Sequence, residues 1–406
     1  MGSNTKNAYR WCVLVFSVLA MLFAGIIYAW SILKTPFAKE FGWEGDQLAL
    51  NFTLTMCTFC LGGLLGSFLS NKMGVKLSGL ISAVLAGGGM TLTAFLNANN
   101  VVMLYLCYAV MAGLGIGIAY NVIIATVSVW FPDKKGFAMG ALLMGFGAST
   151  LILGSLAEKG FNSKLGFKGT YVVLGAALFA VLAFVSLLLK RPDADTKLPS
   201  AKKTLSNSTE DFEKKDYSPI QMLKRFSFWR AFVLLAFATA VGNSVISFAR
   251  DLAISVEAEE SLATALVGVF AVFNGLGRIV TGALFDWLGR KKTMLIATLL
   301  LIVAAGTTLL SVIISSLPIC IIGLCLIGLS YGTVPIMVSA FILSFYGQKH
   351  FATNFSIMNC NLICASFMAT ACAGMLDSFG SYIAPFVALL TLSAVAFLLN
   401  LSLKKP

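Results

Sequence analysis

The sequence predicts an all-α integral membrane protein with twelve transmembrane helices arranged as two pseudo-symmetric six-helix bundles. Three observations predict this fold class. The chain of 406 residues is 58% hydrophobic and only 11% charged, whereas soluble globular proteins carry about 25% charged residues. Apolar segments long enough to cross a bilayer follow one another along most of the chain. Two polar turns recur at one fixed offset, which indicates an internal duplication.

The individual helices follow from segment length, because about twenty apolar residues are needed to cross a bilayer as a helix. Twelve segments meet that length, at 12–33, 47–70, 75–96, 101–130, 137–158, 169–190, 228–249, 262–285, 293–315, 318–345, 351–375 and 379–403. Pro132 and its charged neighbours favour a turn between the fourth and fifth segments. The first segment is too long for the core of a signal peptide and lacks an Ala-x-Ala cleavage pattern, so we expect it to remain as a helix.

The distribution of Lys and Arg over the loops predicts the orientation. Twenty-two of the 29 lie in loops on one side of the predicted helices, six lie on the other side, and the last is Arg278. Because the side richer in basic residues faces the cytoplasm, both termini of a twelve-helix protein in the plasma membrane are predicted to be cytoplasmic. The net charge of +12 is scattered over short loops, which argues against a nucleic-acid partner.

The longest polar segment, 191–226, predicts the domain organisation. It is rich in Lys, Asp, Glu, Ser and Thr, a composition typical of a flexible linker, with a short amphipathic helix expected around 219–225. We predict that it is cytoplasmic and tethers an N-terminal six-helix bundle, 1–190, to a C-terminal six-helix bundle, 227–406.

The two predicted bundles are related by an internal repeat. The turn at 67–76 aligns with the turn at 282–291 at an offset of 215 residues, and 131–135 aligns with 346–350 at the same offset. Two equivalent turns at one offset indicate a duplicated six-helix unit. Such repeats are common in secondary transporters, which hold substrate near the bilayer midplane between the halves.

These features resemble a known family, the Major Facilitator Superfamily, over the whole length of the chain. The resemblance is carried by the twelve helices, the long central loop and the motif Gly282-x3-Asp286-x2-Gly289-Arg290-Lys291. Within that family the chain is similar to the oxalate/formate antiporter and monocarboxylate transporter branch. The motifs that carry this second resemblance are Gly25-x2-Tyr28-x-Trp30, Trp130-Phe131-Pro132-Asp133-Lys134-Lys135-Gly136-x-Ala138-x-Gly140 and Asn274-Gly275-x2-Arg278.

Arg278 is the predicted substrate ligand, because it falls inside an apolar helix. A charged side chain at the bilayer centre costs about 2.5 to 3.5 kcal/mol on insertion scales, so it faces a polar cavity or a partner. All seventeen Asp and Glu lie in loops or at helix ends. A guanidinium in a medium of low dielectric favours an anion, and its fork suits a carboxylate. The alternative is a structural arginine bonded to helix carbonyls.

Further residues are expected around this arginine. Asn274 lies one helical turn before Arg278 and is therefore on the same face. It could orient the guanidinium or bond the second oxygen of the substrate, and packing between helices is the alternative. The resemblance implies that residues at similar depth in other helices line the anion cavity, although each of them could equally be a packing residue. They are Tyr28, Tyr120, Tyr331 and Asn359.

One departure from the family pattern predicts the charge of the substrate. In the oxalate-exchanging members a second basic residue is expected in the eleventh helix, but the stretch 354–359 contains no lysine. One fixed positive charge then favours a monocarboxylate such as formate or lactate over oxalate. Proton carriers inside membranes are usually Asp, Glu or His, and the predicted core has none. Anion exchange, uniport and symport with protons that travel with the bound acid all remain open.

The turn between the eighth and ninth helices is predicted to act as a gate. A carboxylate there can sit at the N-terminus of a neighbouring helix, where the dipole favours it, and can be released when the halves move. The gating residues are predicted to be Gly282, Asp286, Gly289, Arg290 and Lys291. The corresponding turn of the first half supplies Asn71 and Lys72. There Ser67 replaces glycine and Asn71 replaces aspartate, so this copy is expected to lock less firmly.

Enzymatic function is not expected, because no nucleophile–base pair, paired carboxylates or metal-ligand cluster appears at membrane depth. Cys57 and Cys60 have CxxC spacing but no second pair and no histidine, so neither a metal nor a cofactor is predicted. The expected partners are the bilayer, a small carboxylate, and protons or a counter-anion, with the protein as a monomer. Two other functions remain open, namely a carrier of a neutral solute or drug with Arg278 structural, and a carboxylate-sensing receptor.

Overall fold

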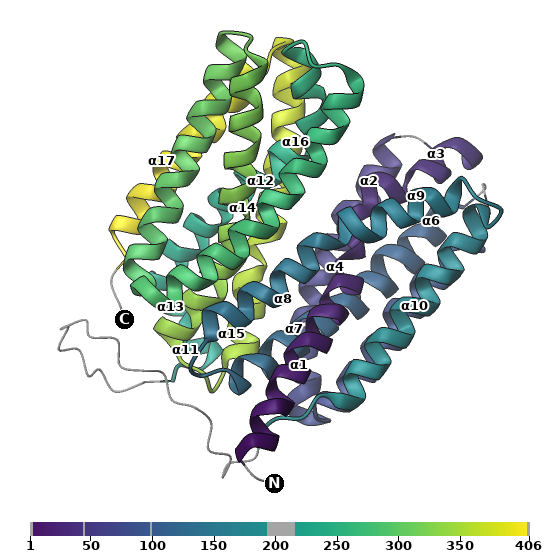
Figure 1. Ribbon diagram of the computed structural model, residues 1–406, viewed down its shortest axis with the longest axis vertical. Helices are drawn as coiled ribbons and strands as arrows, with labels where there is room; N and C mark the ends of the chain where they lie inside the picture. The colour runs from purple at the N-terminus through teal and green to yellow at the C-terminus, as the bar shows by residue number, and fades with distance from the viewer. Residues whose placement is uncertain (1–2, 44, 98–99, 193–215, 404–406) are drawn as a thin grey trace. The chain divides into compact units, whose positions relative to one another are not determined.

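The computed structural model describes residues 3–43, 45–97, 100–192 and 216–403. Those residues are almost entirely helical and include no strand. They divide into two compact units, each a bundle of helices (Figure 1). Unit 1 comprises Met1–Lys203 with Phe355–Ile357, and unit 2 comprises Thr204–Asn354 and Met358–Pro406. Most of the predicted linker falls on 193–215, outside the described residues.

Unit 1 contains the first six predicted membrane segments, and all six are helical. Three are regular, namely α4 (Gly45–Lys72), α5 (Val75–Thr93) and α10 (Gly166–Leu188). The other three change helix type along their length. The first is α1 (Ser3–Ala24), the 3-10 helix η1 (Gly25–Ala29) and α2 (Trp30–Leu33), followed by α3 (Thr35–Phe41). The fourth is α6 (Val101–Leu104), the π-helix η2 (Tyr105–Ala112) and α7 (Gly113–Trp130); the fifth is α8 (Lys135–Ser149), the π-helix η3 (Thr150–Gly154) and α9 (Ser155–Phe161).

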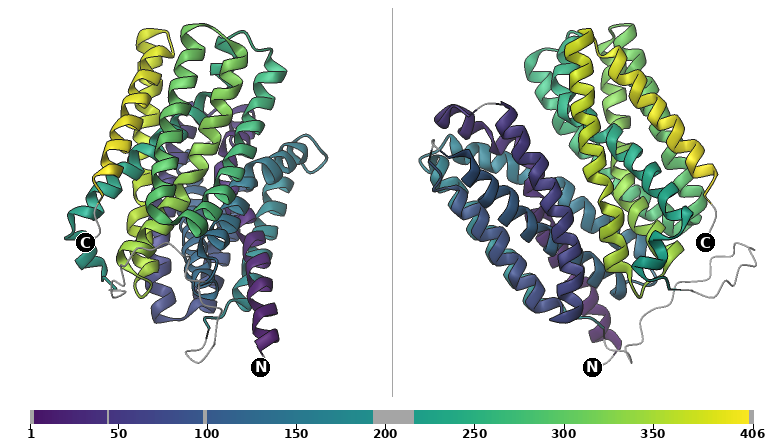
Figure 2. Two further views of the ribbon diagram at one scale, coloured as in Figure 1. Left: turned by 60° about the vertical axis from the view of Figure 1, so that its left-hand side comes forward. Right: turned by 180° about the vertical axis from the view of Figure 1, so that it is seen from behind.

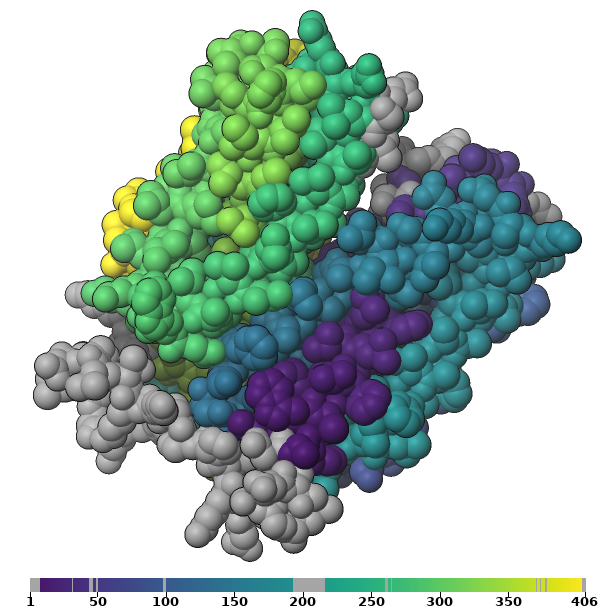
Figure 3. All heavy atoms as spheres, in the orientation of Figure 1, coloured from purple at the N-terminus to yellow at the C-terminus, as the bar shows by residue number. Residues whose placement is uncertain are grey.

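Close backbone approach holds unit 1 together. Helix α1 packs against α8 and α10, as the face drawn in Figure 3 shows, and α4 packs against α7. A Cβ at Gly62 would collide with the backbone of Leu114, and one at Gly117 would collide with the carbonyl of Phe59. Because lipid provides no hydrophobic drive between helices, small residues that allow such contacts are a main source of packing energy.

Unit 2 contains the other six predicted segments, apart from Phe355–Ile357, and the short helix expected before them. The helices are α11 (Pro219–Leu223), α12 (Phe226–Ser255), α13 (Glu260–Ile313), α14 (Leu317–Tyr346), α15 (Phe351–Asn359), α16 (Asn361–Phe379) and α17 (Ile383–Leu401). Helix α17 packs against α12 and α13 and is drawn in yellow at the end of the chain (Figure 2). The predicted short helix is confirmed as α11, which begins with a capping box formed by Ser218 and Gln221.

Helix α13 accounts for two predicted membrane segments. At about 1.5 Å per residue its 54 residues are far too long for a single crossing of a hydrocarbon core about 30 Å thick. Gly289 interrupts it with φ 73° and ψ 176°, between the predicted segments 262–285 and 293–315. Eleven helices among the described residues are long and apolar enough to span a membrane. The longest of them, in α13, contains two membrane segments, so the total agrees with the twelve that the sequence predicts.

The same backbone turn occurs in both units. Gly74 precedes α5 with φ 84° and ψ 163°, and Gly289 stands 215 residues later with nearly the same angles. A positive φ combined with an extended ψ is essentially confined to glycine. The repeat predicted from sequence is therefore visible in the backbone as well.

The boundary between the last two membrane helices lies later than the sequence predicted. Helix α16 continues to Phe379 and α17 begins at Ile383, rather than at 375 and 379. The reason is the position of Gly380, which adopts the left-handed conformation at φ 61° and donates its backbone N–H to the carbonyl of Leu376 at 2.8 Å. A left-handed glycine is a common helix C-terminal stop.

Candidate functional site

Arg278 is buried in α13, one helical turn after a buried amide. Its exposed fraction is 5% and that of Asn274 is 6%. The Nε of Arg278 donates a hydrogen bond to Oδ1 of Asn274 at 3.3 Å. A permanent cation in such a position requires polar or anionic neighbours. Asn274 supplies an oxygen to the guanidinium and adds no charge of its own.

The Arg278 turn is fixed against α14 by two glycines. A Cβ on Gly332 of α14 would collide with the carbonyl of Asn274, and a Cβ on Gly277 would collide with the carbonyl of Leu329. The two backbones therefore touch beside Arg278. Because neither helix can rotate without losing this contact, the direction in which Arg278 leaves its helix is set by glycine packing.

Tyr331 is the second predicted residue that the structure brings to this place. It is 7% exposed, it precedes Gly332, and its ring occupies the space where a Cβ on Gly242 of α12 would lie. Three helices of unit 2, α12, α13 and α14, thus meet around a buried arginine, an amide and a phenol.

Asn359 lies at a break in the eleventh membrane segment. It ends α15, is 9% exposed, and is followed by Cys360 before α16 begins. Beside this break Thr239 donates to Oδ1 of Asn361 at 3.2 Å, and Nδ2 of Asn361 donates to the carbonyl of Met358 at 2.8 Å. Sequence reasoning missed Thr239 and Asn361, because polar residues on neighbouring helices give no signal of their contact.

The two tyrosines predicted in the first half share an aromatic cluster in unit 1. Tyr28 in η1 packs edge-on against Phe146 with ring centroids 5.5 Å apart, and Tyr120 in α7 packs against the same ring at 5.1 Å. Phe59 of α4 contacts Tyr120 at 5.1 Å. The apolar Phe59 and Phe146 gave no functional signal in the sequence, yet Phe146 links the two predicted residues.

The predicted gate of unit 2 lies at the break in α13. Asp286 and Lys291 are exposed, Gly282 is buried, and Gly289 forms the break itself. The guanidinium of Arg290 lies over the ring of Phe345 in α14, 4.4 Å from its centroid. This geometry is a cation–π contact. It ties the turn to the end of α14, a partner that the sequence motif does not contain.

The corresponding turn of unit 1 makes different contacts. Asn71 accepts a hydrogen bond from Nη2 of Arg191 at 3.3 Å, just after α10, and Nζ of Lys72 lies 5.8 Å from the ring of Phe68. A neutral amide thus replaces the carboxylate of the second copy. The two copies of the turn share a backbone shape, while Arg290 packs on Phe345 in one copy and Asn71 binds Arg191 in the other.

A buried ion pair in unit 1 was not anticipated from the sequence. Arg10 binds Asp133 through two hydrogen bonds of 2.8 and 3.2 Å. The guanidinium of Arg10 also lies 5.0 Å from the ring of Phe131, and Arg10 is only 4% exposed. The start of α1 is therefore clamped to the turn between α7 and α8.

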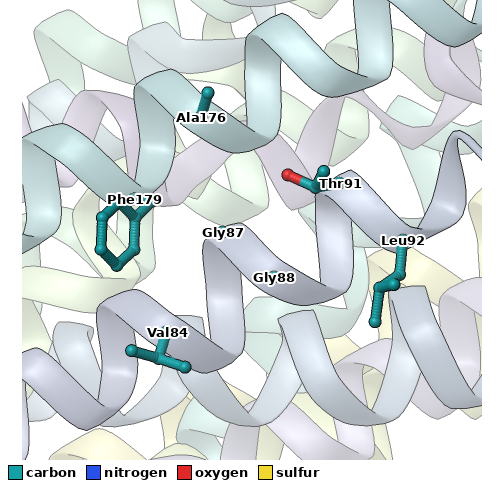
Figure 4. Close-up of a pocket in the computed structure, with 7 residues that line it drawn as sticks. All are labelled: Val84, Gly87, Gly88, Thr91, Leu92, Ala176 and Phe179. Carbon is teal, nitrogen blue, oxygen red and sulfur yellow. The ribbon is translucent and has the colours of Figure 1, made fainter.

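One surface pocket lies apart from all of these residues. It has a cavity volume of about 470 Å³ and lies between α5 and α10 (Figure 4). Its lining residues are Val84, Gly87, Gly88, Thr91, Leu92, Ala176 and Phe179. A lining in which Thr91 alone carries a polar side chain is unsuited to an anion, so this groove is not the candidate site.

Comparison with known families decides the identity of the fold. The family model described as Major Facilitator Superfamily matches residues 13–369. The chain belongs to the Major Facilitator Superfamily. It is therefore a multi-pass membrane transporter, and the fold and family predicted from the sequence are confirmed.

Curated relatives confirm the predicted branch of the superfamily. The chain is 25% identical over 363 residues to an uncharacterized MFS-type transporter, YhjX, of Escherichia coli (strain K12), covering 88% of this chain and 86% of the relative. It is 26% identical over 291 residues to the oxalate:formate antiporter of Oxalobacter formigenes, covering 70% of this chain and 65% of the relative. It is 24% identical over 380 residues to monocarboxylate transporter 12 of Rattus norvegicus, covering 88% and 77%.

Solved structures show the same fold at low identity. The proton:xylose symporter XylE has a TM-score of 0.74 at 14% identity and covers 98% of this chain and 97% of its own. The superfamily transporter FucP in its outward conformation has a TM-score of 0.67 at 15% identity, covering 97% and 99%. These relatives and structural neighbours are transporters, which supports a role in transport rather than in catalysis.

Proposed function

We propose that this transporter moves small monocarboxylate anions, formate-like or lactate-like, across the plasma membrane by alternating access. The observation that carries the proposal is the buried Arg278 guanidinium, 5% exposed and oriented by a neutral amide. A guanidinium presents paired N–H donors that match a carboxylate. The relatives named as an oxalate:formate antiporter and a monocarboxylate transporter support the same substrate class.

The charge of the substrate follows from the eleventh membrane segment. Helix α15 supplies Asn354 and Asn359 where a second basic residue would be needed for a dianion. The Nδ2 of Asn354 donates to the carbonyl of Tyr217 at 3.0 Å, so that amide serves the packing of unit 2. One arginine balances one carboxylate, and oxalate is therefore the poorer substrate.

The remaining predicted residues have supporting roles in the same proposal. Tyr28, Tyr120, Tyr331 and Asn359 line the anion path. The turn residues Gly282, Asp286, Gly289, Arg290 and Lys291, with Asn71 and Lys72, act as the gate. Segments 1–190 and 227–406 move as the two bodies of a monomer, joined by 191–226, with both termini in the cytoplasm. Transport proceeds by anion exchange, by uniport or with a proton carried on the acid, because no Asp, Glu or His is predicted at membrane depth.

Counterflow in proteoliposomes tests the substrate class. Vesicles loaded with unlabelled formate, lactate, oxalate or a neutral sugar are offered labelled lactate, with and without a pH gradient. We expect formate and lactate to drive uptake and oxalate to be weak. The proposal is contradicted if internal oxalate drives uptake of labelled lactate as strongly as internal formate or lactate does. It is also contradicted if only the internal sugar drives that uptake. Stimulation by an inward proton gradient selects symport, and its absence selects exchange or uniport.

Variants of Arg278 test the assigned ligand. Hydrogen bonds to charged groups contribute about 1.5 to 3 kcal/mol, which corresponds to roughly tenfold to a hundredfold in affinity. Arg278→Ala should abolish uptake, and Arg278→Lys should keep the charge but lose the paired donors. The matched control is Arg250→Ala, which removes an arginine whose side chain is 43% exposed and should leave uptake near the wild-type level.

One result would reject the assignment of Arg278, and another would reject transport itself. Wild-type uptake by Arg278→Ala, at equal amounts of folded protein, would show that the arginine is structural. Binding of labelled lactate by the wild-type protein without accumulation inside vesicles would instead indicate a carboxylate sensor.

A further inference from the structure

The segment that enters unit 2 has an apolar side exposed on the protein surface. We call this side the entry patch and define it as Ile220, Leu223, Phe226 and Trp229, which are 67%, 37%, 67% and 48% exposed. Two of these residues lie in α11 and two in the first turn of α12. Met222 points the other way and is fully buried. The element is therefore amphipathic and leaves its larger apolar side chains outside the protein.

The inner side of this element is pinned to unit 2. The backbone N–H of Tyr217 donates to the carbonyl of Tyr346 at 3.0 Å, and Asn354 donates to the carbonyl of Tyr217. Oδ1 of Asp216 accepts the backbone N–H of Lys349 at 3.0 Å. These three bonds join the residues just before α11 to the end of α14, to the turn that follows it and to the first turn of α15. Such anchoring prevents the helix from rolling its apolar side inward.

The joint between α11 and α12 is also held rigid. The indole N–H of Trp229 donates to the carbonyl of Leu223 at 2.9 Å. The guanidinium of Arg230 lies 4.4 Å from the ring centroid of Phe226, and its Nη1 donates to the carbonyl of Ser402 at 3.1 Å. The members of the entry patch are thus kept together on one surface.

Positive charge borders the entry patch. Lys224 and Arg225 are exposed between α11 and α12, and Arg230 lies one turn into α12. Exposed apolar side chains beside Lys and Arg are typical of segments that lie in the interface of an anionic bilayer. The position along the chain agrees with that reading, because Phe226 is the first residue of a membrane-spanning helix.

We propose that α11 and the first turn of α12 form a lipid-binding element. The entry patch inserts at the level of the headgroups and upper acyl chains, and Lys224 contacts the headgroups of acidic phospholipids. A bilayer fits better than a protein partner, because α12 must cross the membrane surface at this point and its flanking side chains necessarily meet lipid. This inference rests on membership of the superfamily and is independent of the substrate.

A fluorescent reporter on the full-length protein tests the proposal. Ile220→Cys is labelled with an environment-sensitive dye in a background where the exposed Cys12 and Cys364 are replaced by serine. The protein is reconstituted in phosphatidylcholine vesicles, with or without phosphatidylglycerol. We expect blue-shifted emission, quenching of about twofold by shallowly brominated lipid, and a larger shift when the acidic lipid is present.

Two labelled positions calibrate the measurement. Lys164→Cys, at an exposed loop position, reports a water environment, and Leu299→Cys, 51% exposed within a spanning helix, reports the acyl chains. Emission at position 220 equal to that at position 164 would overturn the proposal. Blue-shifted emission without quenching by brominated lipid would also overturn it, because that result means coverage by protein.

Removal of one charge tests the headgroup contact. Adding Lys224→Gln to the labelled protein should reduce the extra blue shift that phosphatidylglycerol causes. Raised salt should reduce the same extra shift in the labelled protein that keeps Lys224. Identical emission in both vesicle compositions would overturn the assignment to acidic headgroups. Equal thermal unfolding midpoints of the labelled proteins show that the comparison concerns folded molecules.

Discussion

Asn274 holds the guanidinium of Arg278 through a neutral contact, with Oδ1 accepting the Nε hydrogen bond at 3.3 Å in a place where both residues are at least nine-tenths buried. An aspartate at the same position would have a similar shape but would carry a full negative charge. In an environment of low dielectric the charge difference dominates the shape similarity. The amide therefore orients the arginine without adding a negative charge, which is what the proposed anion-binding role of Arg278 requires.

Asn274→Asp is expected to weaken anion uptake at neutral pH by about tenfold or more, because a carboxylate paired with Arg278 competes with the substrate. The loss should persist on acidification to pH 5, since the adjacent guanidinium favours the ionised carboxylate over the protonated carboxyl. Initial rates of labelled lactate uptake from pH 5 to pH 8 measure this.

The matched control for that change is Asn400→Asp. Asn400 is also a helix amide in unit 2, and its Nδ2 donates to Oγ1 of Thr298 at 3.1 Å. Its uptake should stay near the wild-type level across the same pH range. An equal loss of uptake in both variants would remove the special role of the contact between Asn274 and Arg278.

Gly332→Ala is expected to lower stability by about 1 to 3 kcal/mol, the usual cost of overpacking, because its Cβ would collide with the carbonyl of Asn274. Uptake should fall as well, since the helix turn that carries Arg278 must move. Gly306→Ala in α13 is the control, because a Cβ there meets nothing within 4 Å and alanine favours helix. Thermal unfolding in detergent measures this difference. Equal unfolding midpoints for Gly332→Ala and Gly306→Ala would contradict the prediction.

Gly289→Ala is expected to cost about 1 to 3 kcal/mol of backbone strain, since the residue has φ 73° and ψ 176°. Gly74→Ala should cost a similar amount at the equivalent turn, with φ 84° and ψ 163°. Gly88→Ala is the control, because it lies within α5 and its Cβ would meet open space. If the unfolding midpoints of Gly289→Ala and Gly74→Ala were no lower than that of Gly88→Ala, the two turns would tolerate a side chain.

Arg10→Ala and Asp133→Ala are each expected to destabilise the protein by about 3 kcal/mol, because breaking a buried pair leaves one charge without its counterpart. The ion pair has two hydrogen bonds of 2.8 and 3.2 Å. Asp251→Ala is the contrasting case, since its contact with Arg250 is 3.9 Å long and both side chains are well exposed. Such surface pairs contribute about 0 to 1 kcal/mol, so a comparable loss for Asp251→Ala in the same unfolding assay would contradict this ranking.

The sequence predicted the helices and the family because those properties depend on local composition. Apolar length marks each span, the basic loops predict orientation, and the offset of 215 residues exposed the repeat that Gly74 and Gly289 show in the backbone. Arg278 could be selected because a charged residue inside an apolar segment can be recognised from the linear sequence alone. Asn274 could be paired with it because one helical turn is a fixed spacing.

Contacts between helices were beyond the reach of the sequence. Nothing local connects Arg10 with Asp133, Arg290 with Phe345, or Tyr28 with Phe146, since the members of each pair are far apart in the sequence. The entry patch could not be predicted from the sequence either. Its exposure depends on the hydrogen bonds that hold Asp216 and Tyr217 against the α14–α15 region. Composition and periodicity determined which segments enter the membrane and which charge goes with them. Only the tertiary structure decided what each polar group touches, because side chains from distant helices meet where glycines let the backbones approach.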